Sequence, residues 1–429
     1  MMLDQAINAS GTVHDRLTAR TVAILFFCAF FMLIEGLDLA AMPLAVPRVS
    51  AQWGQPPSAF ALSLSAVLIG IGLASVLLAP LGERFGRKRM IVWTGMLAAG
   101  ATFGTATADN ISAFVVWRLL TGIGLGACLP NVTASVARIA PMHMRARILA
   151  IVNTAIPVGS VTAALIVAPV VRIGNWQALF VIAGLLTLIA IAGLVILMPS
   201  HQQAIPSSST TTRRQPSASP LFELFLPAHR IKTLLLLGLA TTNTFLIYMM
   251  INWLPTLLPR GGMPVDTAAR LSGLFQFGGI VGGFFFAYQL DRGRAVRTFV
   301  GGYLCAAAGL IGIAVTAYSG TLWALLLLAI GVGISGAHIA ITIFGMIFYP
   351  QHLLSSFVGL SIAVTRSGAI CGPLAGGWLV AHVAGVGGFM LAALIPVALC
   401  IAWVLIIGRA ERTGIMALPT ITKENCDRA

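Results

Sequence analysis

Twelve long apolar runs, separated by short polar stretches, constrain this chain more than any other feature of its sequence. A helix needs about 20 consecutive apolar residues to cross the hydrocarbon core of a bilayer. The runs cover residues 21–41, 59–80, 90–108, 112–135, 148–170, 176–198, 231–255, 268–290, 296–318, 320–344, 357–380 and 384–408. We therefore predict an all-α integral membrane protein with twelve transmembrane helices.

The composition supports a membrane protein and excludes several other classes. Only 9% of the 429 residues are charged and 58% are hydrophobic, whereas a soluble globular protein carries roughly 25% charged residues. An ordinary soluble domain and a disordered chain are both excluded by this balance. The six cysteines have neither paired nor metal-ligand spacing. We interpret them as small buried apolar residues, and we expect no metal and no cofactor.

The basic residues indicate the orientation of the chain in the membrane. Of the 26 Lys and Arg, twenty lie in the loops and tails on one side, four lie on the opposite side, and two lie inside apolar runs. Because short cytoplasmic loops are enriched in Lys and Arg, both termini and the long central loop are expected in the cytoplasm. The net charge of +14 therefore reports topology, and we expect no nucleic-acid partner.

A polar central segment divides the runs into two sets of six. Residues 199–230 are rich in Ser, Thr, Pro and Gln, a composition typical of a flexible linker. The predicted organisation is a cytoplasmic N-terminal tail (1–20), a six-helix half (21–198), a cytoplasmic linker (199–230), a second six-helix half (231–408) and a cytoplasmic C-terminal tail (409–429). Two pseudo-symmetric halves with a substrate site between them are typical of secondary transporters.

Two acidic residues occur inside the first apolar run, and they are the only two of the twelve acids at membrane depth. A charge there costs on the order of 3 kcal/mol, so Glu35 and Asp38 call for a function. Their i, i+3 spacing places both on one helix face. Glu35 lies about fourteen residues into this run from its cytoplasmic end, or roughly 21 Å at 1.5 Å per residue, which places it in the outer half of the bilayer. Two adjacent carboxylates indicate proton coupling, and bracing of the helix end is the structural alternative.

Two arginines also lie inside apolar runs. Arg118 is expected at the depth of Glu35, so it pairs either with Glu35 or Asp38 or with the carboxylate of a substrate. Arg366 is the embedded cation of the second half, where no acid lies at membrane depth. A cation of this kind is a good receptor for a carboxylate. The structural alternatives are a permanent ion pair for Arg118 and binding to helix-end carbonyls for Arg366.

Several motifs resemble the major facilitator superfamily. The loop after the second run reads Glu83-Arg84-Phe85-Gly86-Arg87-Lys88-Arg89, which is similar to the signature loop of that superfamily, although Glu83 replaces the usual Asp and Ala79 the usual Gly. The fourth run contains RLLTGIGLG from Arg118 to Gly126, similar to a second signature. The Glu35-Gly-Leu-Asp38 stretch resembles the acid–Gly–x–Asp motif of the aromatic acid:proton symporters, with MLIEGLDLAA and INWLPTLL most similar to transporters of 3-(3-hydroxyphenyl)propionate.

The resemblance implies the superfamily fold and a gating role for Glu83, Arg84, Gly86, Arg87, Lys88 and Arg89. It also implies proton-coupled uptake of an aromatic carboxylate, such as 3-(3-hydroxyphenyl)propionate or a related phenolic acid, across the inner (plasma) membrane by alternating access. We expect a monomer that is not an enzyme and has no catalytic residues. A proton-coupled exporter of drugs or hydrophobic organic acids is the alternative. This chain has Leu354 where the family that it resembles usually carries an Arg, twelve residues before Arg366.

A phenolic acid needs polar partners for its ring hydroxyl beside an apolar or aromatic wall. Tyr248 and Asn252 share a helix face at i, i+4 spacing, and Gln276 lies in the next run. We predict that these three residues contact substrate together with Arg118 and Arg366. For Tyr248, an anchoring role at the membrane interface is the alternative. His338 can relay protons, although a packed histidine is the more frequent case.

Overall fold

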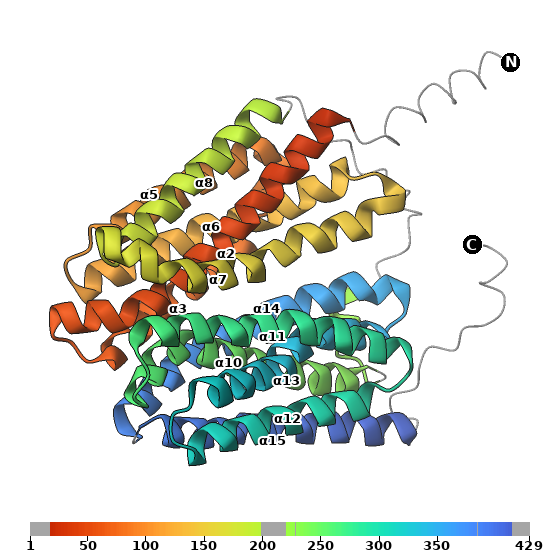
Figure 1. Cartoon of the computed structure of the whole chain (residues 1–429). Helices are drawn as coiled ribbons and strands as arrows, with labels where there is room; N and C mark the ends of the chain where they lie inside the picture. Colours follow the sequence, from red (N-terminus) through yellow and green to blue (C-terminus); the bar gives the residue numbers. More distant parts are fainter. Residues whose placement is uncertain (1–17, 199–219, 228, 384, 414–429) are drawn as a thin grey trace, which may run out of the picture. The chain divides into compact units, whose positions relative to one another are not determined.

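The described backbone is helical, as expected for segments that cross a bilayer, where each N–H and C=O group must bond within its own segment. The computed structural model describes residues 18–198, 220–227, 229–383 and 385–413, and these ranges contain helices and turns but no strand (Figure 1). Eleven helices among the described residues are long and apolar enough to cross a membrane. α5 (Arg87–Ala106) is the remaining long helix, and its first turn carries three basic residues. The predicted all-α architecture is therefore confirmed.

The chain divides into two compact units, one formed by Met1–Val49 and Ala66–Ser209 and the other by Ser50–Ser65 and Thr210–Ala429. Besides α5, the first part of the chain forms α2 (Ala19–Trp53), α3 (Ala61–Leu77), α4 (Leu81–Phe85), α6 (Ile111–Ile139), η2 (Met142–Met144), α7 (Arg145–Gly174) and α8 (Gln177–Leu197). The second unit contains η1 (Pro57–Phe60), α9 (Pro220–Glu223), α10 (Arg230–Arg260), α11 (Val265–Asp291), α12 (Ala295–Val315), α13 (Gly320–Met346), α14 (Gln351–His382) and α15 (Gly385–Arg412).

Each predicted run corresponds to one long helix, and the largest difference is at the end of the first. α2 continues to Trp53, twelve residues beyond the predicted end at residue 41, and it contains Pro43 and Pro47. The extension is physically reasonable because residues 44–46 are apolar and buried. The predicted run ended at residue 41, before the two prolines, whereas the helix passes through both.

Glycines bring the same two pairs of helices into close contact in both units. A Cβ on Gly122 or Gly126 of α6 would lie 2.1 or 2.4 Å from a backbone oxygen of α3, and one on Gly282 of α11 would lie 2.5 Å from an oxygen of α13. α2 and α7 meet through glycine in the first unit, as α10 and α14 do in the second. By order in the chain these are equivalent pairs. Small residues at such crossings allow the backbones to approach.

The last part of the predicted linker has a defined structure. The predicted tail at 1–20, linker at 199–230 and tail at 409–429 lie partly outside the described residues, since 1–17, 199–219 and 414–429 are not described. Pro220–Pro227 is described and packs against the second unit: Leu224 is fully buried, and its carbonyl accepts a hydrogen bond of 2.8 Å from Thr233 Oγ1. We call Pro220–Pro227 the docking segment. The prediction of a flexible linker up to residue 230 was wrong here, because the Leu224 side chain packs into the second unit.

Thr233 and His352 bond the docking segment directly, and Tyr349 bonds Thr233. The Tyr349 hydroxyl lies 2.7 Å from Thr233 Oγ1, and Glu223 Oε1 lies 3.0 Å from His352 Nε2. Burial raises the pKa of Tyr349 to about 12. Burial and the neighbouring Lys232 lower the pKa of His229. The docking segment is therefore bound to the first turn of α10 by a buried hydrogen bond and to the first turn of α14 by an exposed polar contact, in addition to the burial of Leu224.

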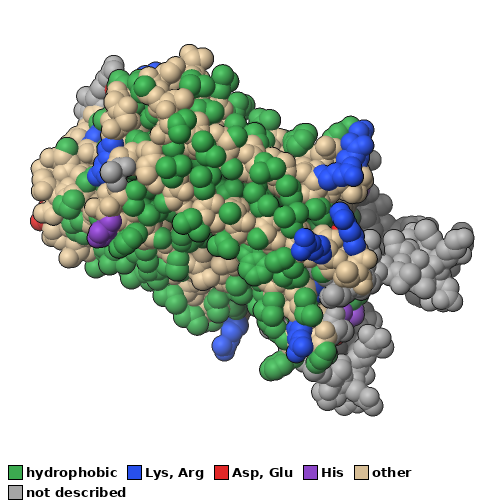
Figure 2. Space-filling model, turned by 90° about the horizontal axis from the view of Figure 1, so that it is seen from below, with side chains coloured by type: hydrophobic (Ala, Val, Ile, Leu, Met, Phe, Trp, Pro, Cys, Tyr) green, Lys and Arg blue, Asp and Glu red, His purple; other side chains and the backbone are tan. Residues whose placement is uncertain are grey.

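The outward surface of the second unit is mostly apolar. In Figure 2 hydrophobic side chains cover much of the visible face and several Lys and Arg side chains gather at one end. Leu304 of α12 and Ile395 of α15 are 55% and 68% exposed, as expected for side chains that face lipid. Cys305 and Cys371 are also exposed, whereas Cys28, Cys128 and Cys400 are buried. The interpretation of all cysteines as buried was therefore wrong for these two, and Cys426 lies outside the described residues.

Candidate functional site

Two acidic side chains of α2 lie one helical turn apart in the interior of the first unit. Glu35 and Asp38 are 2% and 3% exposed. Both lie near the middle of α2, because this helix continues to Trp53. The sequence placed them in the outer part of a shorter helix, and the observed bounds correct that position. Bracing of a helix end, the structural alternative, does not fit residues in the middle of a helix.

Arg118 of α6 forms an ion pair with Asp38. Its Nη2 lies 2.8 Å from Asp38 Oδ2 and its Nη1 lies 3.1 Å from Oδ1. Two parallel N–H···O contacts of this kind are the strong, bidentate form of an arginine–carboxylate pair. Thr102 of α5 adds a longer contact of 3.4 Å from its Oγ1 to Asp38 Oδ1. Of the partners that the sequence left open for Arg118, the structure contains Asp38.

Glu35 is in a different environment from Asp38. Its Oε2 atom is buried and has no hydrogen-bond partner among the described residues. Arg118 Nε is likewise buried without a partner in the described part of the chain. One cation thus faces two carboxylates, and both oxygens of Asp38 are satisfied while Glu35 is not. An unsatisfied buried carboxyl is costly as an anion and far less costly when it carries a proton.

The Phe180 ring lies beside the guanidinium in a cluster of three aromatic side chains that the sequence did not indicate. The Arg118 Cζ atom lies 5.6 Å from the centre of the Phe180 ring. Phe180 packs edge-to-face on Phe114 and Trp176 at centroid distances of 6.0 Å in each case. All three rings are buried. They exclude water from the ion pair and strengthen it, but aromatic residues in apolar runs are too common to give a signal in one sequence.

A close crossing of α2 and α7 lies beside the acid pair. A Cβ on Gly36 would lie 1.8 Å from the carbonyl oxygen of Ile156, and one on Gly159 would lie 1.8 Å from that of Leu33. Ser160 Oγ donates a 2.9 Å hydrogen bond to the Gly36 carbonyl. The backbone of α7 therefore fixes α2 at the residue between the two acids.

In the second unit, Arg366 lies in the middle of α14. It is half-buried, and no described residue forms a hydrogen bond or an ion pair with it. His338 of α13 is close enough for an electrostatic interaction with Arg366. The structural alternative, in which Arg366 binds helix-end carbonyls, finds no support in these contacts. Leu354, in the first turns of the same helix, is half-buried.

The predicted polar partners for a substrate ring lie on α10 and α11. Tyr248 and Gln276 are half-buried, and Asn252 is buried with its Nδ2 donating a 2.7 Å hydrogen bond to the Tyr248 carbonyl. Because this bond uses the Asn252 amide nitrogen, the side-chain oxygen can accept a hydrogen bond from another group. Half-buried Tyr248 lies well inside α10, so the helix bounds do not favour the alternative of an interface anchor.

The predicted gating loop connects α3 to α5 through the short helix α4. Glu83, Arg84 and Arg89 are exposed, and Gly86, Arg87 and Lys88 are half-buried. Gly86 has φ +91°, a conformation that L side chains rarely adopt, so the turn into α5 requires glycine. The structure therefore explains Gly86 by backbone geometry alone.

The charged residues of this loop make few and weak contacts. Arg87 Nη2 lies 3.9 Å from Glu83 Oε1, and Lys88 Nζ donates a hydrogen bond to the Met198 carbonyl at the end of α8. Burial and the neighbouring Arg138 lower the pKa of Arg87, against the opposing effect of Glu83. The long, exposed Glu83–Arg87 pair adds little stability, so these charges are available for other partners.

Comparisons with known proteins are consistent across the chain. The family described as Major Facilitator Superfamily matches residues 22–367. The 3-(3-hydroxy-phenyl)propionate transporter of Escherichia coli (strain K12) is 29% identical, covering 87% of this chain and 91% of the relative. The gallate transporter of Pseudomonas putida is 28% identical over 88% and 90%. A bacterial homolog of the human lysosomal transporter Spinster, in an inward-facing and unoccupied conformation, has a similar fold, with a TM-score of 0.79, 16% identity and coverage of 94% and 100%.

Proposed function

Because the chain belongs to the Major Facilitator Superfamily, we propose that it couples proton entry to the uptake of an aromatic carboxylate, such as 3-(3-hydroxyphenyl)propionate or a related phenolic acid. Membership of this family agrees with the expectation of a transporter rather than an enzyme. The relatives named for hydroxyphenylpropionate and gallate support the substrate class. The proposal further places a monomer in the plasma membrane with both termini in the cytoplasm, in line with the distribution of Lys and Arg.

The observation that carries the proton coupling is the contrast between Asp38 and Glu35. Arg118 neutralises the charge of Asp38, whereas an ionised Glu35 would be a second negative charge without a cation of its own. At membrane depth an ionised carboxylate without a partner costs on the order of 3 kcal/mol. Glu35 therefore holds the transported proton in this arrangement and releases it when water reaches the site.

Substrate recognition rests on Arg366 of α14 and on polar residues of α10 and α11 in the second unit. A half-buried guanidinium without a partner among the described residues can donate hydrogen bonds to both oxygens of a carboxylate. Tyr248, Asn252 and Gln276 supply hydroxyl and amide groups for a ring hydroxyl. Arg118 takes part when a substrate carboxylate competes with Asp38, and the 83–89 loop acts as a gate that forms charge pairs in one conformation.

The test is transport by purified protein in proteoliposomes with an imposed pH gradient. The wild type is expected to concentrate 3-(3-hydroxyphenyl)propionate inside vesicles whose exterior is acidic. Glu35→Gln should lose this accumulation while it still exchanges labelled for unlabelled substrate without a gradient. Asp109→Asn, an exposed acid of the same unit outside the membrane, is the matched control and should behave as the wild type.

Two results would contradict the proposal. Accumulation by Glu35→Gln equal to that of the wild type would remove Glu35 from proton coupling. Wild-type transport that concentrates substrate only on the acidic side of the membrane would indicate a proton-coupled exporter instead.

A further inference from the structure

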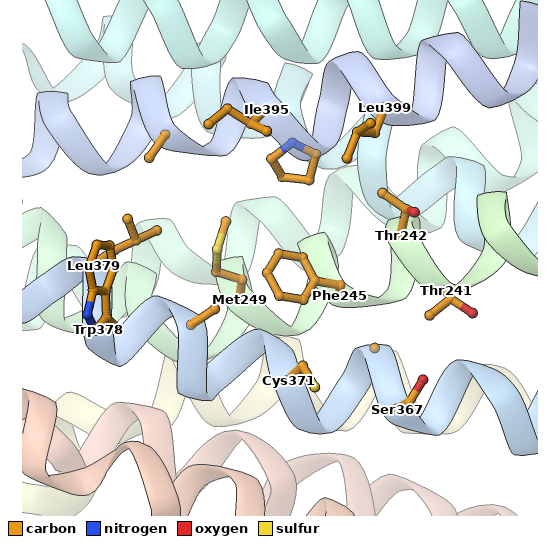
Figure 3. Close-up of a pocket in the computed structure, with 14 residues that line it drawn as sticks. Thr241, Thr242, Phe245, Met249, Ser367, Cys371, Trp378, Leu379, Ile395 and Leu399 are labelled. Atoms are coloured by element: carbon orange, nitrogen blue, oxygen red, sulfur yellow. The ribbon is translucent and has the colours of Figure 1, made fainter.

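A groove opens on the surface of the second unit between α14 and α15, with α10 as its floor. Its volume is about 660 Å³. Figure 3 shows Phe245 and Met249 of α10 lying between Ile395 and Leu399 of α15 on one side and Cys371 of α14 on the other. The groove exists because the facing positions carry small residues: Ser367, Gly368, Cys371 and Ala375 on α14, and Ala392 on α15.

The groove is apolar over most of its length, and the exception is Thr241 Oγ1, which is buried without a hydrogen-bond partner among the described residues. The hydroxyls of Thr242 and Ser367 donate hydrogen bonds to the carbonyls of Gly238 and Val364 in their own helices, which leaves carbon atoms toward the groove. From Ser367 to Leu379 the lining follows α14 for roughly 18 Å, at 1.5 Å per residue. An apolar groove of this length that opened to water would be unfavourable.

The rim of the groove is continuous with the apolar surface that surrounds it. Trp378, Ile395 and Leu399 line the groove and are 61%, 68% and 50% exposed. In a chain that spans a membrane, side chains exposed in this way face lipid. The medium that meets the groove therefore consists of acyl chains, and an empty groove would forfeit their contacts.

A cation lies at one end of the groove. Arg260 follows Met249 by three helical turns on the same face of α10. Its Nη1 donates a 3.0 Å hydrogen bond to the carbonyl of Val380, the residue after the groove residue Leu379. The side chain is exposed, so its other N–H groups can reach a further acceptor. Trp378 stacks on His382 at this end, with centroids 4.8 Å apart, and aromatic rings are typical of the headgroup level.

We propose that this groove is a binding site for one phospholipid, with an acyl chain between α14 and α15 and the phosphate on Arg260. Guanidinium groups bind phosphate through two parallel hydrogen bonds, and the aromatic pair at the same end favours the headgroup level. The site is separate from the residues proposed for transport and does not depend on the aromatic-acid assignment.

The chain itself supplies a probe and a matched control. Cys371 lines the groove, whereas Cys305 of α12 is equally an exposed thiol on an apolar surface but does not line it. The full-length protein is purified in detergent with its lipid removed, and the reaction of each thiol with an apolar maleimide is followed by peptide mass spectrometry. Dioleoyl phosphatidylglycerol is expected to slow labelling of Cys371 about tenfold, as mass action predicts for a site near saturation, and to leave Cys305 unchanged.

Arg260→Gln tests the headgroup contact against Arg270→Gln, which removes an exposed arginine at the start of α11 that is not part of the groove. Loss of a charged hydrogen bond should raise the lipid concentration for half-protection of Cys371 roughly tenfold in Arg260→Gln. Arg270→Gln should have no effect. Half-protection of Cys371 at the same lipid concentration in Arg260→Gln as in the wild type would overturn the role of Arg260.

Three further outcomes would overturn the site itself. Equal protection of Cys305 and Cys371 would indicate general coverage by lipid. Protection of Cys371 by 3-(3-hydroxyphenyl)propionate but not by phospholipid would assign the groove to an aromatic ligand, for which Thr241 Oγ1, buried without a described partner, is an available hydrogen-bonding group. Protection that rises with protein concentration in the absence of phospholipid would indicate a second copy of the chain.

Discussion

Arg118 and Asp38 form a bidentate pair, in which Nη2 donates to Oδ2 at 2.8 Å and Nη1 donates to Oδ1 at 3.1 Å. Glu35, one turn away on the same helix, has an oxygen without a partner among the described residues. Two carboxylates of similar chemistry are thereby given different tasks by a single arginine. Asp38 has Arg118 as its counterion in this conformation, and Glu35 is free to bind a proton.

Breaking the Arg118–Asp38 pair should destabilise the protein more than removing it altogether. Arg118→Gln or Asp38→Asn alone leaves a buried charge unpaired, which costs about 3–5 kcal/mol, whereas the double variant leaves none. The thermal stability of the three variants in detergent measures this. Glu83→Gln, which removes one partner of the exposed 3.9 Å pair with Arg87, is the control and should change stability by less than about 1 kcal/mol. Additive losses in the double variant would argue against a coupled pair.

The crossing of α2 and α7 should not tolerate a methyl group. Gly159→Ala places a Cβ 1.8 Å from the Leu33 carbonyl oxygen, so the helices must separate and the acid pair must move. We expect a loss of about 1–3 kcal/mol in stability together with loss of transport. Gly100→Ala in α5, where a Cβ has nothing within 4 Å, should be neutral or slightly stabilising. Equal effects of the two substitutions in thermal melting and uptake assays would contradict this contact.

Arg366→Gln should affect the carboxylate of a substrate selectively. Loss of a charged hydrogen bond of about 1.5–3 kcal/mol predicts a KM for the acid that rises at least tenfold. The KM for the corresponding amide, if it is carried, should change far less. Competition by acid and amide against labelled substrate in proteoliposomes measures both. An equal rise in KM for the acid and the amide would show that Arg366 does not bind the substrate carboxylate.

The docking segment should open more often when Thr233 loses its hydroxyl. Thr233→Val removes the bonds to the Leu224 carbonyl and the Tyr349 hydroxyl but keeps the shape of the side chain. We expect amide hydrogen exchange in residues 222–226 to become about tenfold faster. Thr242→Val, whose hydroxyl bonds only within its own helix at 2.8 Å, is the matched control and should leave these amides unchanged.

Protonation of His229 provides a second way to open the docking segment. Its pKa is lowered in the folded protein, so folding favours the neutral ring, and the unfolded segment binds more protons as the pH falls below the ordinary His value. Stability of the segment should therefore fall between about pH 6.5 and the lower folded pKa. His229→Gln should flatten this pH dependence in hydrogen exchange. Three charged or titratable side chains face the His229 ring: Lys232, Glu223 and His352. His352→Gln is a second variant, which distinguishes the titration of His229 from that of the His352–Glu223 pair.

The helices and the unusual charges could be predicted from the sequence, because both depend on counting. Each long helix overlaps one predicted run over most of its length, and Glu35, Asp38, Arg118 and Arg366 stand out as ionisable residues in apolar surroundings. The pairing of Arg118 could not be predicted, since depth along a helix says nothing about rotation around it. Phe180 and the crossing at Gly159 depend on which helices become neighbours, and the exposed Cys371 depends on a gap between two of them.

The position of the docking segment also sets where the chain can be divided. A cut or an inserted cleavage site within residues 199–219 leaves Leu224 joined to Thr233 and to the rest of the second unit. A cut between Leu226 and Arg230 releases the same contact, although composition alone treats both places as linker. Two separately expressed halves should therefore reassemble best when the second fragment begins before Pro220.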